Sequence, residues 1–428
     1  MTFAAQTGRA RALFEKGDFL PILALVIAIQ GTVLISQSAA ALFLEPVAIG
    51  KIRLFESVIS VGVLLAGFGA PALAIREMAA HDNSQHRAEL LRDLLLLPLF
   101  GAILLVVVAL IGTLFDAKWI GPARDVLFTA GILLIAVNLV RLASAICQGL
   151  LIVRHVYGWV IVGSILAAAL QIVGATFGTL TWWIAGRLMG EAALLACILF
   201  AMRNHLPSIA WQKRPHVGAL FTTMTRSTLV NIGLIIRMLA DAAPILLLGG
   251  LLVNIAANAT GTDVGHFGVA TLFLTAALLP ISVMAQRSLP LITAANVENR
   301  TGIVKSFKRH MFLLGIVIAF VGAATALILR LFDNGRLGPG LTVAAVLMLS
   351  IPFKALASAY GTNMLATGEL RWPVWITLAE LVFIVIVMKF GSAAEPIWTA
   401  SFSVIGGSMV SVFGMVAGDQ IMKTRSYA

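Results

Sequence analysis

Charged side chains are scarce in this chain. Asp, Glu, Lys and Arg together make up 11% of the 428 residues, whereas hydrophobic residues make up 60%. A soluble globular domain carries about 25% charged residues, most of them on its solvated surface. The composition therefore excludes a soluble globular protein and predicts a polytopic membrane protein made of helices.

Cysteine is almost absent. The chain has 2 cysteines, Cys147 and Cys197, and each lies inside an apolar run with no second Cys or His at ligand spacing. This arrangement excludes a disulfide framework and a zinc site. We expect both residues to serve packing, and we expect no metal and no cofactor.

Catalytic signatures are also missing. The sequence has no phosphate-binding Gly-Lys-Ser/Thr loop, no His-Glu-x-x-His and no Gly-x-Ser-x-Gly pattern, which argues against an ATP-driven pump and against the common hydrolases. It also lacks the large polar domain of a membrane-bound glycosyltransferase. We therefore expect no catalytic residues and no enzyme, but a transporter that moves cargo through a cleft between two lobes.

Apolar runs separated by charges, Gly and Pro predict about twelve transmembrane helices. The first run is too long for the core of a signal peptide and has no clear cleavage site, so it is expected to remain as the first span. The predicted spans lie near 19–44, 53–75, 94–115, 126–150, 157–179, 181–202, 228–252, 265–289, 310–332, 340–363, 371–391 and 395–421.

The formal net charge of +11 would suggest nucleic acid as a partner of a soluble chain, but here most Lys and Arg fall in short loops between apolar runs. With the N-terminus in the cytoplasm, nineteen basic residues lie on the inner side and seven on the outer side. The positive-inside rule therefore places both termini in the cytoplasm. The expected partner of this basic, apolar chain is the lipid bilayer, and no nucleic acid is expected.

A polar connection divides the spans into six and six. It runs over 207–227 and separates an N-terminal lobe, 1–206, from a C-terminal lobe, 228–428. The tetrapeptide Leu-Ala-Ser-Ala begins at 142 and again at 356, an offset of 214 that is half of 428. Six spans return the chain to its starting side, so the lobes should be parallel repeats related by a pseudo-two-fold axis along the membrane normal.

Arg237 and Asp241 lie about halfway along the seventh span. Neither charge can easily reach water at that depth, and their i, i+4 spacing puts both on one helical face. One interpretation is an internal ion pair that fixes helix packing. The other is that the pair lines a transport cavity, with Arg237 on the cargo and Asp241 orienting it.

Arg141 and Lys354 occupy nearly equivalent positions at mid-depth of the fourth and tenth spans, and neither has an acid at i±3 or i±4. They are candidate cavity cations, with cross-helix pairing to Glu380 or to helix-end carbonyls as the alternative. Glu380, midway along the eleventh span, could relay protons or neutralise Lys354.

Two further cations have local acids. Arg187 is followed by Glu191 at i+4, and Arg53 is followed by Glu56 at i+3 near the outer end of the second span. Arg187 and Arg53 are therefore weaker candidates for substrate binding, and Glu191 is a candidate for orienting a cation or coupling an ion.

Three segments carry a resemblance to a known family. Phe68-Gly-Ala-Pro-Ala-Leu-Ala-Ile-Arg76-Glu77 is similar to the Phe-Gly, small-residue and basic ending of the family's second span. Val264-Gly-His-Phe-Gly-Val-Ala270 resembles the Val-Gly-x-Tyr-x-x-Ala opening of its eighth span, with Phe267 in place of the Tyr, and the segment 279–290 resembles its close. The chain thus resembles the polysaccharide flippases, of O-antigen translocase type, in the multidrug/oligosaccharidyl-lipid/polysaccharide (MOP) exporter superfamily.

This resemblance implies a function. Such proteins move undecaprenyl-pyrophosphate-linked oligosaccharides, the repeat units of O-antigen or exopolysaccharide, across the bacterial inner membrane by alternating access through a cationic cavity. Arg and Lys suit a pyrophosphate, Arg through bidentate bonds and Lys as a point charge. A glycan polymerase and glycosyltransferases are the implied protein partners.

Two alternatives stay open at this point. A proton- or sodium-coupled multidrug exporter of the same superfamily would need unpaired acids in its cavity, for which the chain offers mainly Glu380. A non-transporting membrane scaffold of a glycan-assembly complex would use its charges only for packing.

Overall fold

The computed structural model describes residues 19–80, 84–114, 127–150, 152–205, 217–249, 259–294, 297–333, 335–367, 369, 371–391 and 395–426. All regular structure in these residues is helical, so the expected all-helical membrane class is confirmed. The expected linker residues 207–216 and the basic N-terminal residues Arg9, Arg11 and Lys16 lie outside the described ranges.

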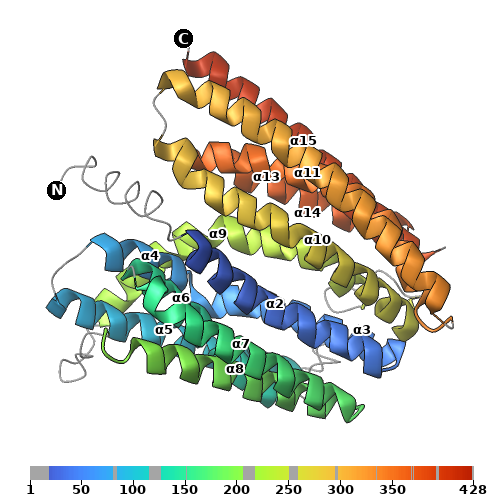
Figure 1. The fold of residues 1–428 in the computed structure, drawn as a ribbon, viewed down its shortest axis with the longest axis horizontal. Coiled ribbons are helices and arrows are strands. Elements are labelled where there is room, and N and C mark those ends of the chain that lie inside the picture. Colours follow the sequence, from blue (N-terminus) through green and yellow to red (C-terminus); the bar gives the residue numbers. More distant parts are fainter. Residues whose placement is uncertain are drawn as a thin grey trace. The chain divides into compact units, whose positions relative to one another are not determined.

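The helices follow the predicted spans in order (Figure 1). They are α2 (Phe19–Phe43), α3 (Pro46–Gly67), α4 (Ala70–Ala80), α5 (Ser84–Leu114), α6 (Leu127–Gly149), α7 (Val153–Thr176), α8 (Leu180–Met202), α9 (Val217–Leu248), α10 (Gly261–Ala294), α11 (Val297–Phe332), α12 (Gly338–Leu347), the 3-10 turn η2 (Met348–Ser350), α13 (Ile351–Ala366), α14 (Arg371–Gly391) and α15 (Pro396–Ser426).

Within the described ranges, nine helical stretches are long and apolar enough to cross a membrane. Helices α2, α3 and α9 cover the remaining expected spans. Several helices run beyond the apolar segment that predicted them: α11 begins at Val297, well before the expected start at 310. Hydropathy locates the part of a helix that lies in lipid, whereas the backbone helix continues into water on charged residues that are good helix formers.

The second span differs from its expected bounds. Helix α3 begins at Pro46 and ends at Gly67, because Phe68 and Gly69 have φ of 46° and 75°, in the left-handed region that stops a helix. Proline is favoured in the first turn of a helix, where its missing N–H costs nothing. Lys51, which precedes the expected start of the span at 53, and Arg53, expected near its outer end, therefore lie inside α3.

A tight turn joins α7 to α8, where the expected spans 157–179 and 181–202 meet. Gly178 has φ of 72°, and the Thr179 side chain accepts a hydrogen bond of 3.4 Å from the Trp182 N–H as the cap of α8. The Phe177 and Trp182 rings lie 5.0 Å apart, and Trp182 is 54% exposed. Exposed aromatic rings at such a turn fit the membrane interface.

The chain forms two compact units. Of the described residues, unit 1 holds Glu45–Leu54 and everything from Ile236 onward, and unit 2 holds everything up to Leu44 together with Phe55–Ile235. Most of the expected N-terminal lobe is in unit 2 and most of the C-terminal lobe is in unit 1. Residues 217–227, expected as linker, form the beginning of α9.

Glycine explains why the start of α3 packs in unit 1. A Cβ at Gly265 of α10 would lie 1.9 Å from the Pro46 carbonyl oxygen, and one at Gly50 would lie 2.8 Å from the Gly265 nitrogen. Only glycine allows two backbones to approach so closely. The glycines of the 264–270 segment thus hold the first turns of α3 against α10.

Within each unit, several helices pack side by side. Helix α7 runs beside α8 and α2 in unit 2, and α14 runs beside α15 in unit 1 (Figure 1). At the end of unit 1, the buried Asp419 of α15 accepts from Lys308 of α11 at 2.9 Å and from Asn363 of α13 at 3.1 Å. This carboxylate ties three helices to one another.

Candidate functional site

Unit 2 contains a sealed ionic network. Arg187 of α8 donates from Nε to Oε1 of Glu56 on α3 at 3.1 Å, and its NH1 pairs with Glu191 one helical turn further on. The Arg187 side chain is 2% exposed, and both carboxylates are 6% exposed. Buried charges persist only when they are paired in this way, so the network joins α3 to α8.

The rotation of α8 is what buries Arg187. Trp183 is fully buried one turn earlier on the same face, and its indole Nε1 donates to the Ser36 carbonyl of α2 at 3.4 Å. Residues four apart lie on one face of a helix, so the rotation that buries Trp183 also turns Arg187 and Glu191 inward.

Arg141 of α6 lies beside this network without closing onto it. Its guanidinium is within electrostatic range of Glu191, Arg187 and Glu56. The side chain is half-buried, and among the described residues it has no hydrogen bond and no ion pair. Of the two strongest sequence candidates, Arg141 is thus the one whose charge is not held by a direct partner in the described ranges.

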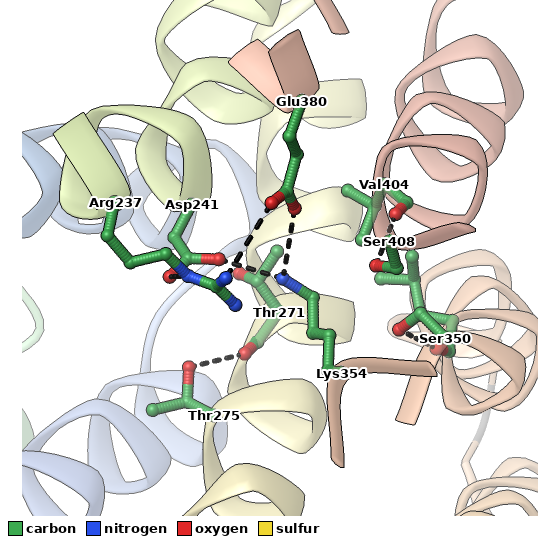
Figure 2. Close-up of polar contacts among 10 residues, drawn as sticks. Arg237, Asp241, Thr271, Thr275, Ser350, Lys354, Glu380, Val404 and Ser408 are labelled. Carbon is green, nitrogen blue, oxygen red and sulfur yellow. Dashed lines mark hydrogen bonds and ion pairs between the residues drawn. The ribbon is translucent and has the colours of Figure 1, made fainter. Parts of the chain in front are cut away.

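Unit 1 contains a second ionic network, centred on Asp241 of α9 (Figure 2). Lys354 Nζ of α13 donates to Asp241 Oδ1 at 2.8 Å, and Arg237 Nε donates to Asp241 Oδ2 at 3.2 Å. Glu380 of α14 points toward both cations, with its carboxylate oxygens 3.6 Å from Arg237 NH1 and 4.0 Å from Lys354 Nζ. Three helices therefore bring two cations and two acids together.

The helix is interrupted at Met348–Ser350, and this interruption sets the position of Lys354. The 3-10 turn ends α12, and α13 begins at Ile351 with Pro352 in its first turn. Lys354 follows directly, near the middle of a membrane span that covers Gly338–Ala366. The ammonium is thus presented at mid-depth, where a lone charge would cost at least about 2.5 kcal/mol.

The two networks differ in exposure. The side chains of Arg237 and Asp241 are 30% and 35% exposed, whereas those of Lys354 and Glu380 are 5% and 2% exposed. Charges exposed to hydrocarbon at this depth are disfavoured by several kcal/mol, so the exposed side of Arg237 and Asp241 must face water. This network is open on one side, in contrast to the sealed network of unit 2.

Arg53 also belongs to unit 1. Its NH2 donates to the Thr271 hydroxyl of α10 at 2.8 Å, and its side chain lies over Gly268, where a Cβ would come within 2.7 Å of the Arg53 Cγ. The Thr271 hydroxyl in turn donates to the Gly268 carbonyl at 2.8 Å. Figure 2 draws Thr271 and its hydrogen-bonded neighbour Thr275 in the same close-up as the Asp241 network.

The eight predicted site residues are divided between the two units. Unit 2 holds Arg141, Arg187 and Glu191, and unit 1 holds Arg53, Arg237, Asp241, Lys354 and Glu380. The i, i+4 pairs Arg187–Glu191 and Arg237–Asp241 are both present. Glu56, which follows Arg53 by three residues, accepts from Arg187. Sequence reasoning missed Thr271 and the role of Glu56, because these contacts join helices far apart in the chain and leave no local spacing to read.

No three His, Cys, Asp or Glu residues within the described ranges are grouped so that they could hold a metal ion. The two networks also lack a nucleophile beside a base, the arrangement that covalent catalysis needs. Their chemistry is the binding of charge.

Comparison with known proteins reveals the fold. No known protein family and no curated protein matches the sequence. A multidrug resistance MATE family transporter of the MOP superfamily matches in its inward-facing conformation with a TM-score of 0.69 at 14% identity, covering 95% of this chain and 96% of that one. Its outward-facing conformation matches with a TM-score of 0.62 at 15% identity, covering 95% and 96%.

A third solved structure has a similar fold. It is a MOP superfamily transporter from Pyrococcus furiosus, described as having a binding pocket of reverse polarity that suggests a different function. It matches with a TM-score of 0.62 at 15% identity, covering 95% of this chain and 94% of that one. At these identities the likeness shows the fold alone. The chain has the fold of MOP superfamily transporters.

Proposed function

We propose that this chain is a flippase that moves an undecaprenyl-pyrophosphate-linked oligosaccharide across the bacterial inner membrane by alternating access. The MOP transporter fold supports transport rather than catalysis. The cargo class rests on the open ionic network of unit 1. In this proposal both termini lie in the cytoplasm and the cargo passes from the inner to the outer leaflet.

One observation carries the proposal. Arg237 and Lys354 converge on a single anionic position, occupied by the Asp241 carboxylate, on the water-facing side of a mid-membrane network. An arginine offers a planar fork and a lysine a compact charge, the combination that suits a phosphate group. Arg53 is a further cation of unit 1 and donates to Thr271 of α10.

An anionic cargo is compatible with this fold. The Pyrococcus furiosus transporter has a similar fold, and it is described as having a binding pocket of reverse polarity that suggests a different function. The likeness to multidrug transporters therefore does not by itself decide between a cationic drug and a lipid pyrophosphate. The convergence of Arg237 and Lys354 on one anionic position favours the pyrophosphate.

The direct test is a flipping assay. The purified protein is placed in liposomes that contain a fluorescent undecaprenyl-pyrophosphate-linked oligosaccharide, and an impermeant reductant reports which leaflet holds the label. Wild type should move the lipid. Arg237→Ala and Lys354→Ala should each slow it about tenfold or more, because a hydrogen bond to a charged group is worth about 1.5–3 kcal/mol.

Two controls sharpen this assay. Lys305→Ala removes an exposed cation of α11 in the same unit and should leave the rate unchanged. Arg237→Lys keeps the charge but loses the fork, so it should also be impaired if the guanidinium binds phosphate. Equal rates for wild type and Arg237→Ala would remove the cargo role of this network.

The second candidate is a cation-coupled multidrug exporter. It is favoured by the Asp241 carboxylate, which is 35% exposed and could meet a cationic drug or a coupling ion. This function predicts that Asp241→Asn abolishes efflux of an organic cation such as ethidium from the same liposomes, and that the lipid pyrophosphate is not moved. A scaffold, in contrast, would move neither cargo.

A further inference from the structure

Asp241 binds its two cations as a phosphate group would. Its Oδ1 accepts from Lys354 Nζ at 2.8 Å, and its Oδ2 accepts from Arg237 Nε at 3.2 Å, so each oxygen serves a different cation (Figure 2). A phosphoryl group also presents several oxygens to separate donors. The carboxylate therefore occupies the position that an anionic ligand of Arg237 and Lys354 would take.

The accessible side of the network is the side of Asp241. Its side chain is 35% exposed, whereas the side chains of Lys354 and Glu380 are 5% and 2% exposed. An anion that arrives from water meets Asp241 before it can reach Lys354. Glu380 lies on the closed side and can keep both cations partly neutralised during an exchange.

The Arg237 guanidinium is incompletely used. It bonds Asp241 through Nε at 3.2 Å and reaches Glu380 through NH1 only at 3.6 Å, beyond normal hydrogen-bond length. An arginine–phosphate pair uses two parallel N–H···O bonds. A phosphate in place of the Asp241 carboxylate would therefore gain a bidentate contact that the carboxylate does not make.

We propose that Asp241 is a displaceable stand-in for the cargo's phosphate, which holds Arg237 and Lys354 while the site is empty and is replaced when the pyrophosphate binds. This inference rests on the proposed function. In the empty site the carboxylate gives both cations a hydrogen-bonded partner at mid-membrane, where an unpaired charge is costly. On the far side of the membrane its return to the cations competes with the cargo and promotes release.

The proposal makes an unusual prediction for binding. Asp241→Asn removes the competing charge, so it should bind an isoprenyl pyrophosphate more tightly than wild type and release it more slowly. If Asp241 only orients Arg237, the same substitution should weaken binding. The probe is farnesyl pyrophosphate, titrated into the full-length protein in nanodiscs, with farnesol as the uncharged control.

Asp241→Asn should lower the Kd for farnesyl pyrophosphate about tenfold and should lower the turnover in the flipping assay. Two variants make the same change of charge elsewhere. Glu395→Gln, at an exposed position of unit 1, should leave Kd unchanged. Glu380→Gln alters the closed side of the same network, where no displacement can occur. It should lower the Kd by less than about threefold.

Each result decides between the ideas. Weaker or unchanged binding by Asp241→Asn, or an equal gain in Glu380→Gln, overturns the stand-in role while the proposed function survives if Arg237→Ala still loses binding. No binding of farnesyl pyrophosphate by wild type or by Asp241→Asn overturns both. Asp241→Ser is the second variant, and loss of folded protein in both would make Asp241 an obligatory packing partner and end the proposal.

Discussion

Arg187 and Glu56 are 131 residues apart in the chain, yet the arginine Nε lies 3.1 Å from the glutamate Oε1 inside unit 2. Arg187→Ala leaves Glu56 and Glu191 buried without their directly paired cation, and breaking a buried pair costs about 3–5 kcal/mol. We expect a lower unfolding temperature and less protein in the membrane. Thermal unfolding in detergent measures the effect.

The matched variants separate packing from cargo binding. The triple variant Glu56→Gln, Arg187→Met and Glu191→Gln removes every charge at similar volume and should recover most of the stability. Arg203→Ala, at an exposed position after the end of α8, should be neutral. An Arg187→Ala protein that is as stable as wild type but inactive would show that Arg187 acts on the cargo instead.

Arg141→Ala should behave in the opposite way. The described residues give this side chain no hydrogen bond and no ion pair, so its removal should keep protein abundance within about two-fold of wild type. If Arg141 faces the cargo's path, surface glycan should be lost. Immunoblotting of membranes and staining of the surface glycan measure the two quantities, and normal glycan at normal abundance would remove Arg141 from the site.

The Arg237 and Asp241 pair can be tested by removing both. If the pair only fixes packing, each single alanine variant should lower abundance and the double variant should restore both abundance and export. If Arg237 binds the cargo, the double variant should be abundant and inactive, because Lys354 still has Glu380 as a partner. Recovery of export by the double variant would leave Arg141 and Lys354 as the remaining candidates.

The positive-inside orientation predicts the sidedness of two exposed residues. Ser306 of α11 is expected on the cytoplasmic side and Thr260, directly before α10, on the outer side. With cysteine at each position in turn, an impermeant maleimide should label position 260 and not position 306 in intact spheroplasts. The reverse pattern would invert the topology.

Gly265→Ala should displace the start of α3, the helix that carries Arg53. The added Cβ would lie 1.9 Å from the Pro46 carbonyl oxygen, so the start of α3 must move away from α10. Such overpacking costs about 1–3 kcal/mol. Gly302→Ala is the control, because nothing lies within 4 Å of its Cβ position and alanine favours a helix by up to about 1 kcal/mol. Equal unfolding temperatures would refute the close contact.

Hydropathy alone located most of this fold. The predicted spans coincide with helices because a chain in lipid must satisfy its backbone hydrogen bonds within each segment, and only a helix does so. The i, i+4 pairs Arg187–Glu191 and Arg237–Asp241 were also readable, because helix geometry determines which residues share a face. The end of α3 at Phe68 and Gly69 was marked by a local motif.

The contacts between helices depended on tertiary structure. Nothing in the spacing of Arg187 and Glu56, of Lys354 and Asp241, or of Arg53 and Thr271 indicates that they meet. Those meetings depend on how each helix is rotated and on which backbones come close, as at Gly265. The same packing left Asp241 exposed and sealed Glu191, although both follow an arginine by four residues, because exposure belongs to the neighbouring helices and not to the sequence of one.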